Sequence, residues 1–109
     1  ANAGEKNLHA QVITYELVGI SQEDYRVKMV EPDAAVLADI DGLVSKVWLA
    51  DDGSGRFGGF YIWESKDKME AFMASEVVAA VVSRPFVQNV NSVDYAVNID
   101  PSKTTRGLK

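Results

Sequence analysis

Two kinds of hydrophobic pattern alternate along the chain, and together they predict a domain of strands and helices. Residues 8–18 are rich in Val, Ile, Thr and Tyr and contain neither Pro nor Gly, which favours a β-strand. Residues 43–50 and 56–64 give the same signal on the two sides of the turn sequence DDGSG, so they predict a β-hairpin. A last strand is expected over residues 86–99.

The first helix is expected after Ser21, an N-cap residue that Asp24 follows in a near capping box. Pro32 lacks an amide donor and is expected to kink this helix or split it in two. The sequence Asp41-Gly42 ends it. One apolar stripe at helical spacing is expected to face the sheet, and it consists of Tyr25, Met29, Pro32, Val36 and Ile40.

The second helical region begins at Ser65, which is predicted to cap a helix over residues 66–74. Ser75 is a candidate cap for a further short helix, which Pro85 ends. The apolar face of the first of these helices is expected to consist of Met69, Phe72 and Met73.

The resulting order is β-α-β-β-α-β, which is the ferredoxin-like, split βαβ pattern of the α+β class, with one four-stranded antiparallel sheet. Such a fold places its helices on one face of the sheet. Both faces of the first and third strands are apolar here, whereas a sheet with one face in water shows a cleaner alternation. The second face is therefore expected to be covered by a second copy of the chain.

Composition sets further limits. The chain has 109 residues and a net charge of -5, which predicts one globular domain over residues 8–99 and excludes nucleic acid as a partner. No apolar run is long enough to span a membrane, and the absence of cysteine makes the cytoplasm the simplest location. Residues 1–7 and 100–109 are expected to be flexible ends.

The sequence lacks the residues that several kinds of functional site require. His9 is the only histidine, and there is no cysteine, so the usual zinc ligand sets are absent and no metal site is expected. Near the start of a strand, His9 is expected on the surface or at the rim. No G-x-S-x-G elbow is present, and Gly58-Gly59 lies inside a strand pattern, where it predicts a bulge or a close backbone approach.

The order of elements and the segments DGLVSKVWLAD and GGFYIWESKDKMEAFMASEVVAAV resemble the dimeric α/β-barrel superfamily that includes the antibiotic-biosynthesis monooxygenases. Within that superfamily the chain is most similar to the YdhR-type monooxygenases. The resemblance implies a dimeric α/β barrel in which two sheets pack face to face and each subunit keeps a cavity between its sheet and helices. It also implies oxidation of phenols or quinols by oxygen without flavin, haem or metal.

The candidate cavity residues follow from the same comparison. Trp63 matches a tryptophan that recurs in the superfamily, and Tyr61 shares its face of the strand. The capped helix turns Phe72 back toward them, so a pocket bounded by these three rings is expected. In the polyketide-tailoring oxygenases an asparagine lies four residues before that tryptophan, where this chain has Gly59. Further candidate substrate-binding residues are Trp48, Arg84, Asn89 and Asn91.

Haem degradation, known in another branch, is not supported. There the matching segment carries an aromatic residue and a haem-ligating histidine, and the corresponding positions here are Phe72 and Val82. Valine cannot ligate iron. No bound cofactor is therefore expected.

Two functions remain open. The first is a cofactor-independent monooxygenase acting on a small electron-rich aromatic, and the second is a non-catalytic dimer that binds a small molecule on the same scaffold. The sequence shows no convincing general base, so the catalytic residue and the substrate stay unassigned.

Overall fold

The structure is a computed structural model that describes residues 7–108. It confirms the α+β, ferredoxin-like fold, in which four antiparallel strands pair in the order β2-β3-β1-β4. The elements in chain order are β1 (His9–Leu17), α2 (Gln22–Tyr25), the π-helical segment η1 (Arg26–Val30), α3 (Glu31–Ala38), β2 (Leu43–Asp51), β3 (Arg56–Trp63), α4 (Lys66–Met73), α5 (Glu76–Val82), β4 (Val87–Ala96) and α6 (Ile99–Thr104).

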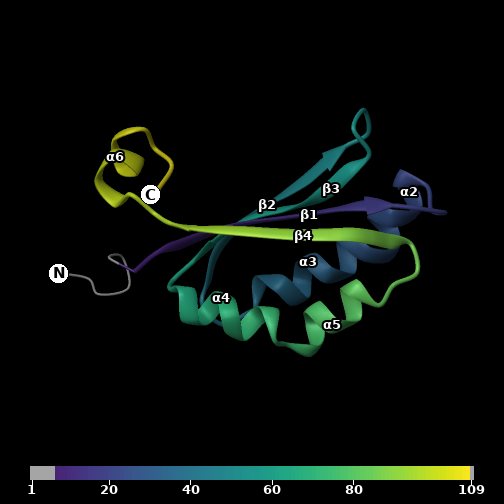
Figure 1. Cartoon of the computed structure of the whole chain (residues 1–109), viewed down its shortest axis with the longest axis horizontal. Helices are drawn as coiled ribbons and strands as arrows, with labels where there is room; N and C mark the ends of the chain where they lie inside the picture. Colours follow the sequence, from purple (N-terminus) through teal and green to yellow (C-terminus); the bar gives the residue numbers. More distant parts are fainter. Residues whose placement is uncertain (1–6, 109) are drawn as a thin grey trace.

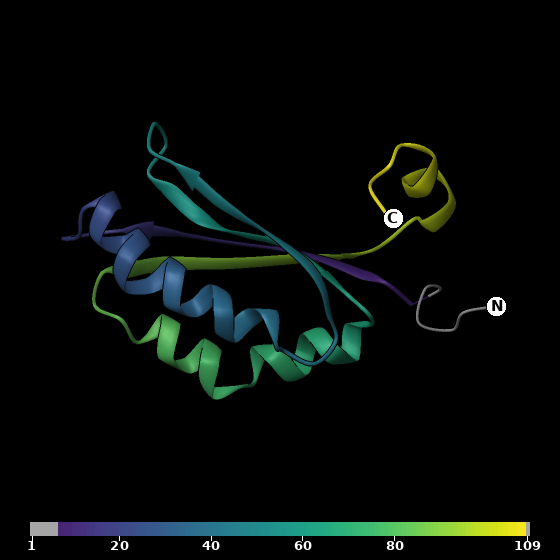
Figure 2. The same cartoon turned by 180° about the vertical axis from the view of Figure 1, so that it is seen from behind.

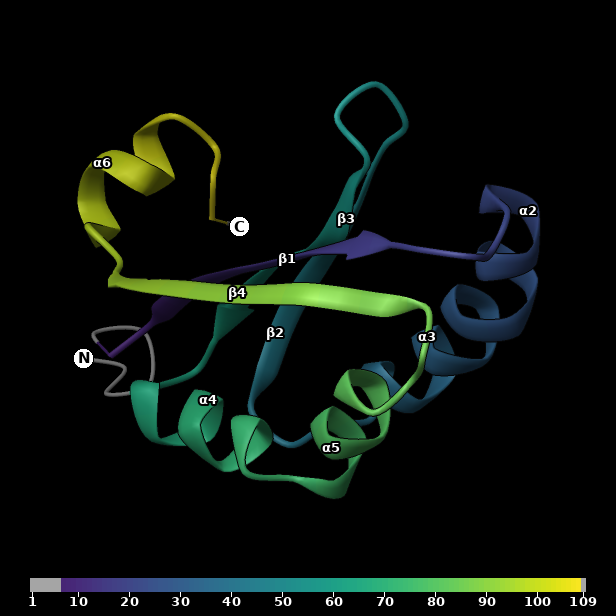
Figure 3. The same ribbon diagram turned by 45° about the vertical axis from the view of Figure 1, so that its right-hand side comes forward.

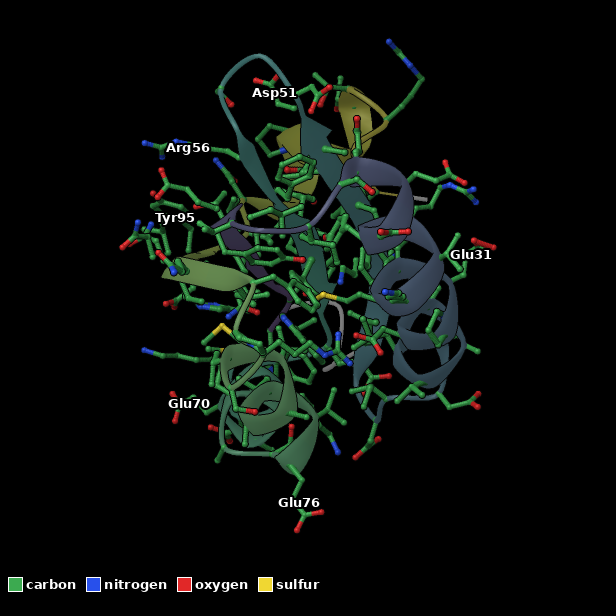
Figure 4. All side chains as sticks on the ribbon, turned by 90° about the vertical axis from the view of Figure 1, so that its right-hand side faces the viewer. Glu31, Asp51, Arg56, Glu70, Glu76 and Tyr95 are labelled. Carbon is green, nitrogen blue, oxygen red and sulfur yellow. The ribbon has the colours of Figure 1, made fainter. Side chains whose placement is uncertain are left out.

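Two layers make up the domain. Helices α3, α4 and α5 lie together on one face of the sheet (Figures 1 and 2), and apolar side chains from both layers meet between them. The acidic side chains Glu31, Glu70 and Glu76 point outward from these helices (Figure 4). This arrangement follows from the amphipathic pattern, because each helix can bury only one stripe.

The two predicted helix caps are confirmed. The Ser21 hydroxyl accepts a hydrogen bond from the amide of Asp24 at 3.0 Å, and the Ser65 hydroxyl accepts one from the amide of Lys68 at 3.2 Å. Ser75 occupies the N-cap position of α5, but its hydroxyl donates to the Phe72 carbonyl instead, at 2.5 Å. The end of α4 and the start of α5 are thus tied together at this residue.

The apolar stripe of the first helical region differs from the expected one. Tyr25 and Met29 are buried as expected, whereas Val36 is 49% exposed and Leu37 is buried in its place. The reason is η1, because a π-helical turn holds one more residue than an α-helical turn and so rotates the following residues. The same rotation brings Asp33 to the sheet side, where Pro32 was expected.

The predicted kink or split at Pro32 takes the form of a local irregularity, because Val30 and Glu31 keep right-handed helical φ and ψ. Pro32 lies in the first turn of α3, where the missing amide hydrogen costs little, and the irregular η1 turn precedes it directly. The regular α-helical pattern is thus interrupted just before the proline.

The last strand is shorter than expected. It ends at Ala96, and the short helix α6 begins at Ile99, inside the segment that we expected to continue the strand and then become a flexible tail. Figure 3 shows α6 apart from the other helices, beyond the end of the sheet. The presence of a helix does not report how mobile the segment is, so the flexibility of residues 100–108 stays a prediction. Residues 1–6 of the expected flexible N-terminus lie outside the described residues.

A buried polar bond anchors the centre of the core. The indole Nε1 of Trp63 donates to Oε1 of Gln11 at 2.9 Å, and Nε2 of Gln11 donates to the Ser92 hydroxyl, also at 2.9 Å. Trp63 and Gln11 are both 0% exposed. Tyr61 stacks on Trp63 with 5.8 Å between ring centroids, and Phe72 packs 5.0 Å from Trp63. The aromatic cluster is therefore held in place by strands β1, β3 and β4 together.

The face of the sheet away from the helices is apolar, as predicted. The pairing register places Val47, Phe60, Val12 and Val93 in one row across all four strands. Phe60 and Val93 are each 39% exposed and Val47 is 57% exposed. Tyr95 lies on the same side, away from the helices (Figure 4). We call the row and Tyr95 the outer apolar face.

Replacing Trp63 with Phe should destabilise the fold. The smaller ring leaves a gap in the core, and the buried Gln11 amide loses the donor of its hydrogen bond. Together these changes should lower the free energy of unfolding by about 2 kcal/mol or more. Thermal unfolding measures the effect as a fall of roughly 10 °C in Tm. The exposed Tyr95→Phe variant is the matched control and should stay near the wild-type Tm. Equal melting of both variants would contradict this account of the core.

Candidate functional site

A small apolar cavity of about 50 Å³ lies between the sheet and the helices. Tyr15 and Tyr61 line it from the sheet, and Leu37 lines it from α3. The opposite wall belongs to α5 and consists of Val77, Val78, Val81 and Val82. The capped start of α4 positions this wall, because α5 follows α4 after a single turn.

Lys46 places an amine in this apolar space. On β2 it lies opposite Tyr61, and its side chain points to the helix side of the sheet, as Trp48 does. The Nζ atom lies 3.2 Å from the centroid of the Trp48 ring and 4.6 Å from that of Tyr61. Among residues 7–108 it has no hydrogen bond or ion pair. Its close partners are therefore aromatic faces, which attract the protonated amine.

Gly59 makes room for this lysine. It lies opposite Trp48 in the hairpin, and a Cβ atom at this position would lie 2.5 Å from Cε of Lys46 and 3.1 Å from the Tyr61 ring. Any larger residue would push the lysine side chain away. The absence of a side chain at Gly59 is thus what admits the Lys46 side chain.

Burial changes the titration of Lys46. Desolvation lowers its pKa from 10.5 to about 7, and the charge of Asp33 opposes this shift without overcoming it. Asp33 is itself committed elsewhere, because Arg84 binds both of its carboxylate oxygens, at 2.9 and 3.4 Å. The amine is therefore held between its charged and neutral forms near neutral pH, which is where a general base works best.

The ion pair of Asp33 and Arg84 also joins two helical regions. Arg84 follows α5, and Asp33 lies on α3 at the edge of the cavity, so the pair ties the end of the valine wall to α3. The sequence suggested Arg84 as a substrate-binding residue. In the structure its guanidinium is engaged by a carboxylate of the same chain.

Tyrosine hydroxyls complete the polar groups near the cavity. The Tyr15 and Tyr25 hydroxyls are 2.5 Å apart. Desolvation is the main cause that raises the pKa of both groups, and burial likewise raises the pKa of Tyr61. All three phenols are therefore neutral at physiological pH and can donate a hydrogen bond.

The structure brings together some of the sequence-predicted residues and separates others. Tyr61, Phe72 and Trp48 line the cavity, as expected. Trp63 does not line it, because it is fully buried behind Tyr61. The substrate-binding role of these residues stays a prediction.

Asn89 and Asn91 lie away from the cavity, in a separate polar cleft that they share with Glu16 and Arg56. The Asn89 amide donates to the Glu16 carboxylate, and Asn89 has a positive φ of 55° at the point where the β1–β4 register shifts. This asparagine therefore shapes an irregular stretch of β4.

The expectation for His9 was wrong. Its side chain is buried at the start of β1, and Nε2 lies 2.6 Å from the Asp94 carboxylate on the neighbouring strand. The alternation of β1 explains this, since His9, Gln11 and Ile13 all face the helices. His9 does not line the cavity.

Trp48 separates the cavity from the surface. Its ring lines the cavity, a groove of about 310 Å³ under α3, and an outer cleft of about 450 Å³ between β2 and the α2–η1 region. Ligand pockets usually measure about 300–1,000 Å³, so the cavity alone is small. A movement of this one ring would join it to the larger cleft.

Sequence reasoning missed Lys46 and Asp33 as site residues. The signal for Lys46 was available, because a lysine between Val44 and Trp48 at period-two spacing occupies a helix-facing position. Asp33 gave no such signal, since its inward position depends on the extra residue in η1.

No group of three or more His, Asp or Glu side chains within residues 7–108 is arranged to hold a metal ion. None of the helices in this part of the chain is long and apolar enough to cross a membrane.

The comparisons with known proteins agree with the fold. A family model described as "Putative mono-oxygenase ydhR" matches residues 12–108. No curated protein matches the chain. A protein of unknown function from Nitrosomonas europaea, NE2512, shares the fold with a TM-score of 0.70 and 14% identity, over 86% of this chain and 92% of that one.

Two solved oxygenase structures are also similar. SnoaB, a cofactor-independent oxygenase from Streptomyces nogalater, has a TM-score of 0.67 and 15% identity, over 84% of this chain and 94% of its own. The ActVA-Orf6 monooxygenase from Streptomyces coelicolor, in complex with nanaomycin D, has a TM-score of 0.66 and 17% identity, over 90% of this chain and 95% of its own. At these identities the likeness shows the fold alone.

The desolvated lysine predicts how stability depends on pH. The pKa of Lys46 is about 7 in the folded protein and 10.5 ordinarily, so between these values the unfolded chain binds a proton that the folded chain lacks. The free energy of unfolding should therefore rise from about pH 7 to about pH 9, by at most about 1.4 kcal/mol per pH unit from this group. Urea unfolding of the wild type and of Lys46→Met measures this. The variant should lack this contribution, the exposed Lys66→Met control should keep it, and equal slopes in all three would refute the desolvation.

Proposed function

The chain belongs to the family of the putative mono-oxygenase ydhR, and on this premise we propose that it is a cofactor-independent monooxygenase of small electron-rich aromatics. The proposed substrates are phenols, quinols or anthrones, which are oxidised by molecular oxygen in the cavity. The observation that carries the proposal is the Lys46 amine, which lies in an apolar cavity with its pKa lowered to about 7 by burial. This group supplies the base that the sequence did not reveal.

In the proposed reaction, neutral Lys46 accepts the phenolic proton of the substrate. The resulting ammonium then lies beside the phenolate and stabilises it in a space from which most water is excluded. The electron-rich anion reacts with oxygen directly, and the substrate supplies all four electrons that reduce the two oxygen atoms. One oxygen atom becomes the new carbonyl oxygen of the product and the other leaves as water.

Aromatic side chains would orient the substrate ring. Trp48 and Tyr61 present their faces to the Lys46 amine. A flat ligand whose phenolic oxygen contacts this amine would lie between the sheet and the valines of α5. Their stacking preference suits a planar ring. We therefore propose that Lys46, rather than Arg84, Asn89 or Asn91, holds the substrate oxygen.

The size of the cavity requires a movement. At about 50 Å³ it is too small for an aromatic substrate. Helix α5 contains no buried residue, and Met73 beside it is adaptable, so this wall can shift with little loss of packing. Outward rotation of Trp48 would add the outer cleft of about 450 Å³.

We further propose that the protein is a homodimer joined through the outer apolar face. The row of Val47, Phe60, Val12 and Val93 crosses the entire sheet, and large exposed apolar patches on small proteins mark interaction surfaces. A second copy offers an identical, complementary patch under twofold symmetry.

A cytoplasmic location stays part of this proposal, on the absence of cysteine.

The second candidate function is a non-catalytic dimer that binds a small molecule. The observation that favours it is the small cavity of about 50 Å³, in which the Lys46 amine already contacts the Trp48 ring. Under this alternative an aromatic ligand would raise the Tm without being consumed.

Oxygen uptake with a panel of quinols and anthrones, in metal-free and flavin-free buffer, tests the catalytic proposal. The wild-type rate should rise with pH through about 7, where Lys46 loses its proton. Loss of the base should lower the rate of Lys46→Met at least about 100-fold, whereas Lys66→Met should keep the wild-type rate. An active Lys46→Met variant would remove Lys46 from the mechanism. Heat protection without oxygen uptake would favour the binding protein.

Sedimentation velocity tests the dimer. The wild type should sediment at twice the mass of the 11.9 kDa chain, and Phe60→Glu should shift it to the monomer because it places a charge within the outer apolar face. Val36→Glu, on the exposed side of α3, is the matched control and should stay dimeric. A wild type that remains monomeric at micromolar concentration would rule out this interface.

A further inference from the structure

We propose that Lys46 is also a nucleophilic amine that condenses with short-chain aldehydes in the cavity and forms an imine. This activity goes beyond the proposed oxygenation. It needs the amine and the cavity but neither molecular oxygen nor an electron-rich substrate, so the two functions can fail separately.

The first support is the surroundings of the amine. Within residues 7–108, Nζ of Lys46 has no carboxylate or carbonyl partner, and its close contacts are the faces of Trp48 and Tyr61. Lys68 shows the opposite situation, because its amine binds the Asp41 carboxylate at 2.5 Å and this bond raises its pKa. An ammonium that is paired in this way keeps its proton. Lys46 has no such carboxylate partner among the described residues, and its burial favours the neutral amine with a free lone pair.

The groups that face Lys46 agree with this reactivity. Asp33 on α3 is the nearest acid, but Arg84 holds it. Tyr15 on β1 and Tyr61 on β3 have raised pKa values and stay neutral, and α5 contributes only valines. Burial therefore sets the titration, and a lysine with a pKa of about 7 is about half neutral at pH 7. An ordinary lysine is neutral in only about one molecule in 3,000 at that pH.

The reaction balances without any other reagent. The Nζ lone pair attacks the carbonyl carbon, and a proton passes from nitrogen to the former carbonyl oxygen. The carbon–oxygen bond then breaks, water leaves, and the carbon–nitrogen double bond forms. Desolvated lysines in apolar pockets are a recognised class of covalent catalyst for carbonyl substrates.

Cavity size selects the class of aldehyde. A volume of about 50 Å³ admits a short alkyl chain more readily than a ring, and the walls that would contact this chain are the valines of α5 and Leu37. The aldehyde carbon would lie at Nζ, above the rings of Trp48 and Tyr61. A small aliphatic aldehyde therefore requires less movement of the walls than an aromatic substrate does.

Reductive trapping tests the proposal on the wild-type protein. Butanal and cyanoborohydride are added near pH 7.5 in the absence of oxygen, and the butylated residues are identified by peptide mass spectrometry. Lys46 should be modified at least about 100-fold faster than the exposed Lys28 and Lys66, because burial favours its neutral form. Its labelling rate should level off above about pH 7.

Two variants separate the proposal from general reactivity. Lys46→Arg keeps a cationic side chain but cannot form an imine, so it should lose the fast labelling, whereas Lys66→Arg should retain it. Gly59→Ala should slow the labelling of Lys46, because its Cβ would displace Cε of the lysine. Labelling of Lys46 no faster than that of Lys66 in the wild type would overturn the proposal. Fast labelling without any oxygen uptake would leave the imine chemistry standing and reject the monooxygenase.

Discussion

The hydrogen bond from Trp63 to Gln11 fixes the part of the sheet on which the site is built. Both side chains are fully buried, so the indole and the amide would each lose much if the other were absent. Tyr61 stacks on Trp63 with an angle of 6° between the rings, and Lys46 lies over Tyr61. The location of the amine is therefore set by a chain of contacts that begins in the centre of the core. A rigid support of this kind is what a reactive group needs in order to keep one position.

Much of the fold was available from the sequence because its signals are local. The caps at Ser21 and Ser65, the hairpin turn and the strand-to-helix corner after Trp63 depend on residues that are neighbours in the chain. The family resemblance added the cavity between the sheet and the helices. The presence of Tyr61, Phe72 and Trp48 at that cavity followed from period-two alternation on the strands and from the helix that Ser65 begins.

The features that the sequence did not predict depend on longer-range geometry. The alternation of β1 places His9 on the helix-facing side, but whether that end of the strand is covered depends on residues far away in the sequence. Lys46 was visible on the helix-facing side of its strand, but its titration depends on how closely two rings and four valines enclose it. The polar cleft at Asn89 arises from a register shift between two strands that are far apart in sequence. Alternation and spacing cannot report such features.

The π-helical turn η1 has a consequence for how the site could change. It is one residue longer than an α-helical turn, and this extra residue turns Asp33 and Leu37 inward. Deleting a single residue there would restore a regular helix and turn Val36 inward, so the Arg84 guanidinium would lose its carboxylate and the cavity would lose its only acidic group among the described residues. The charge inside this pocket can thus be altered by deleting one residue, without replacing any residue that lines the pocket. Relatives that differ here by one residue would carry a different pocket on an unchanged sheet.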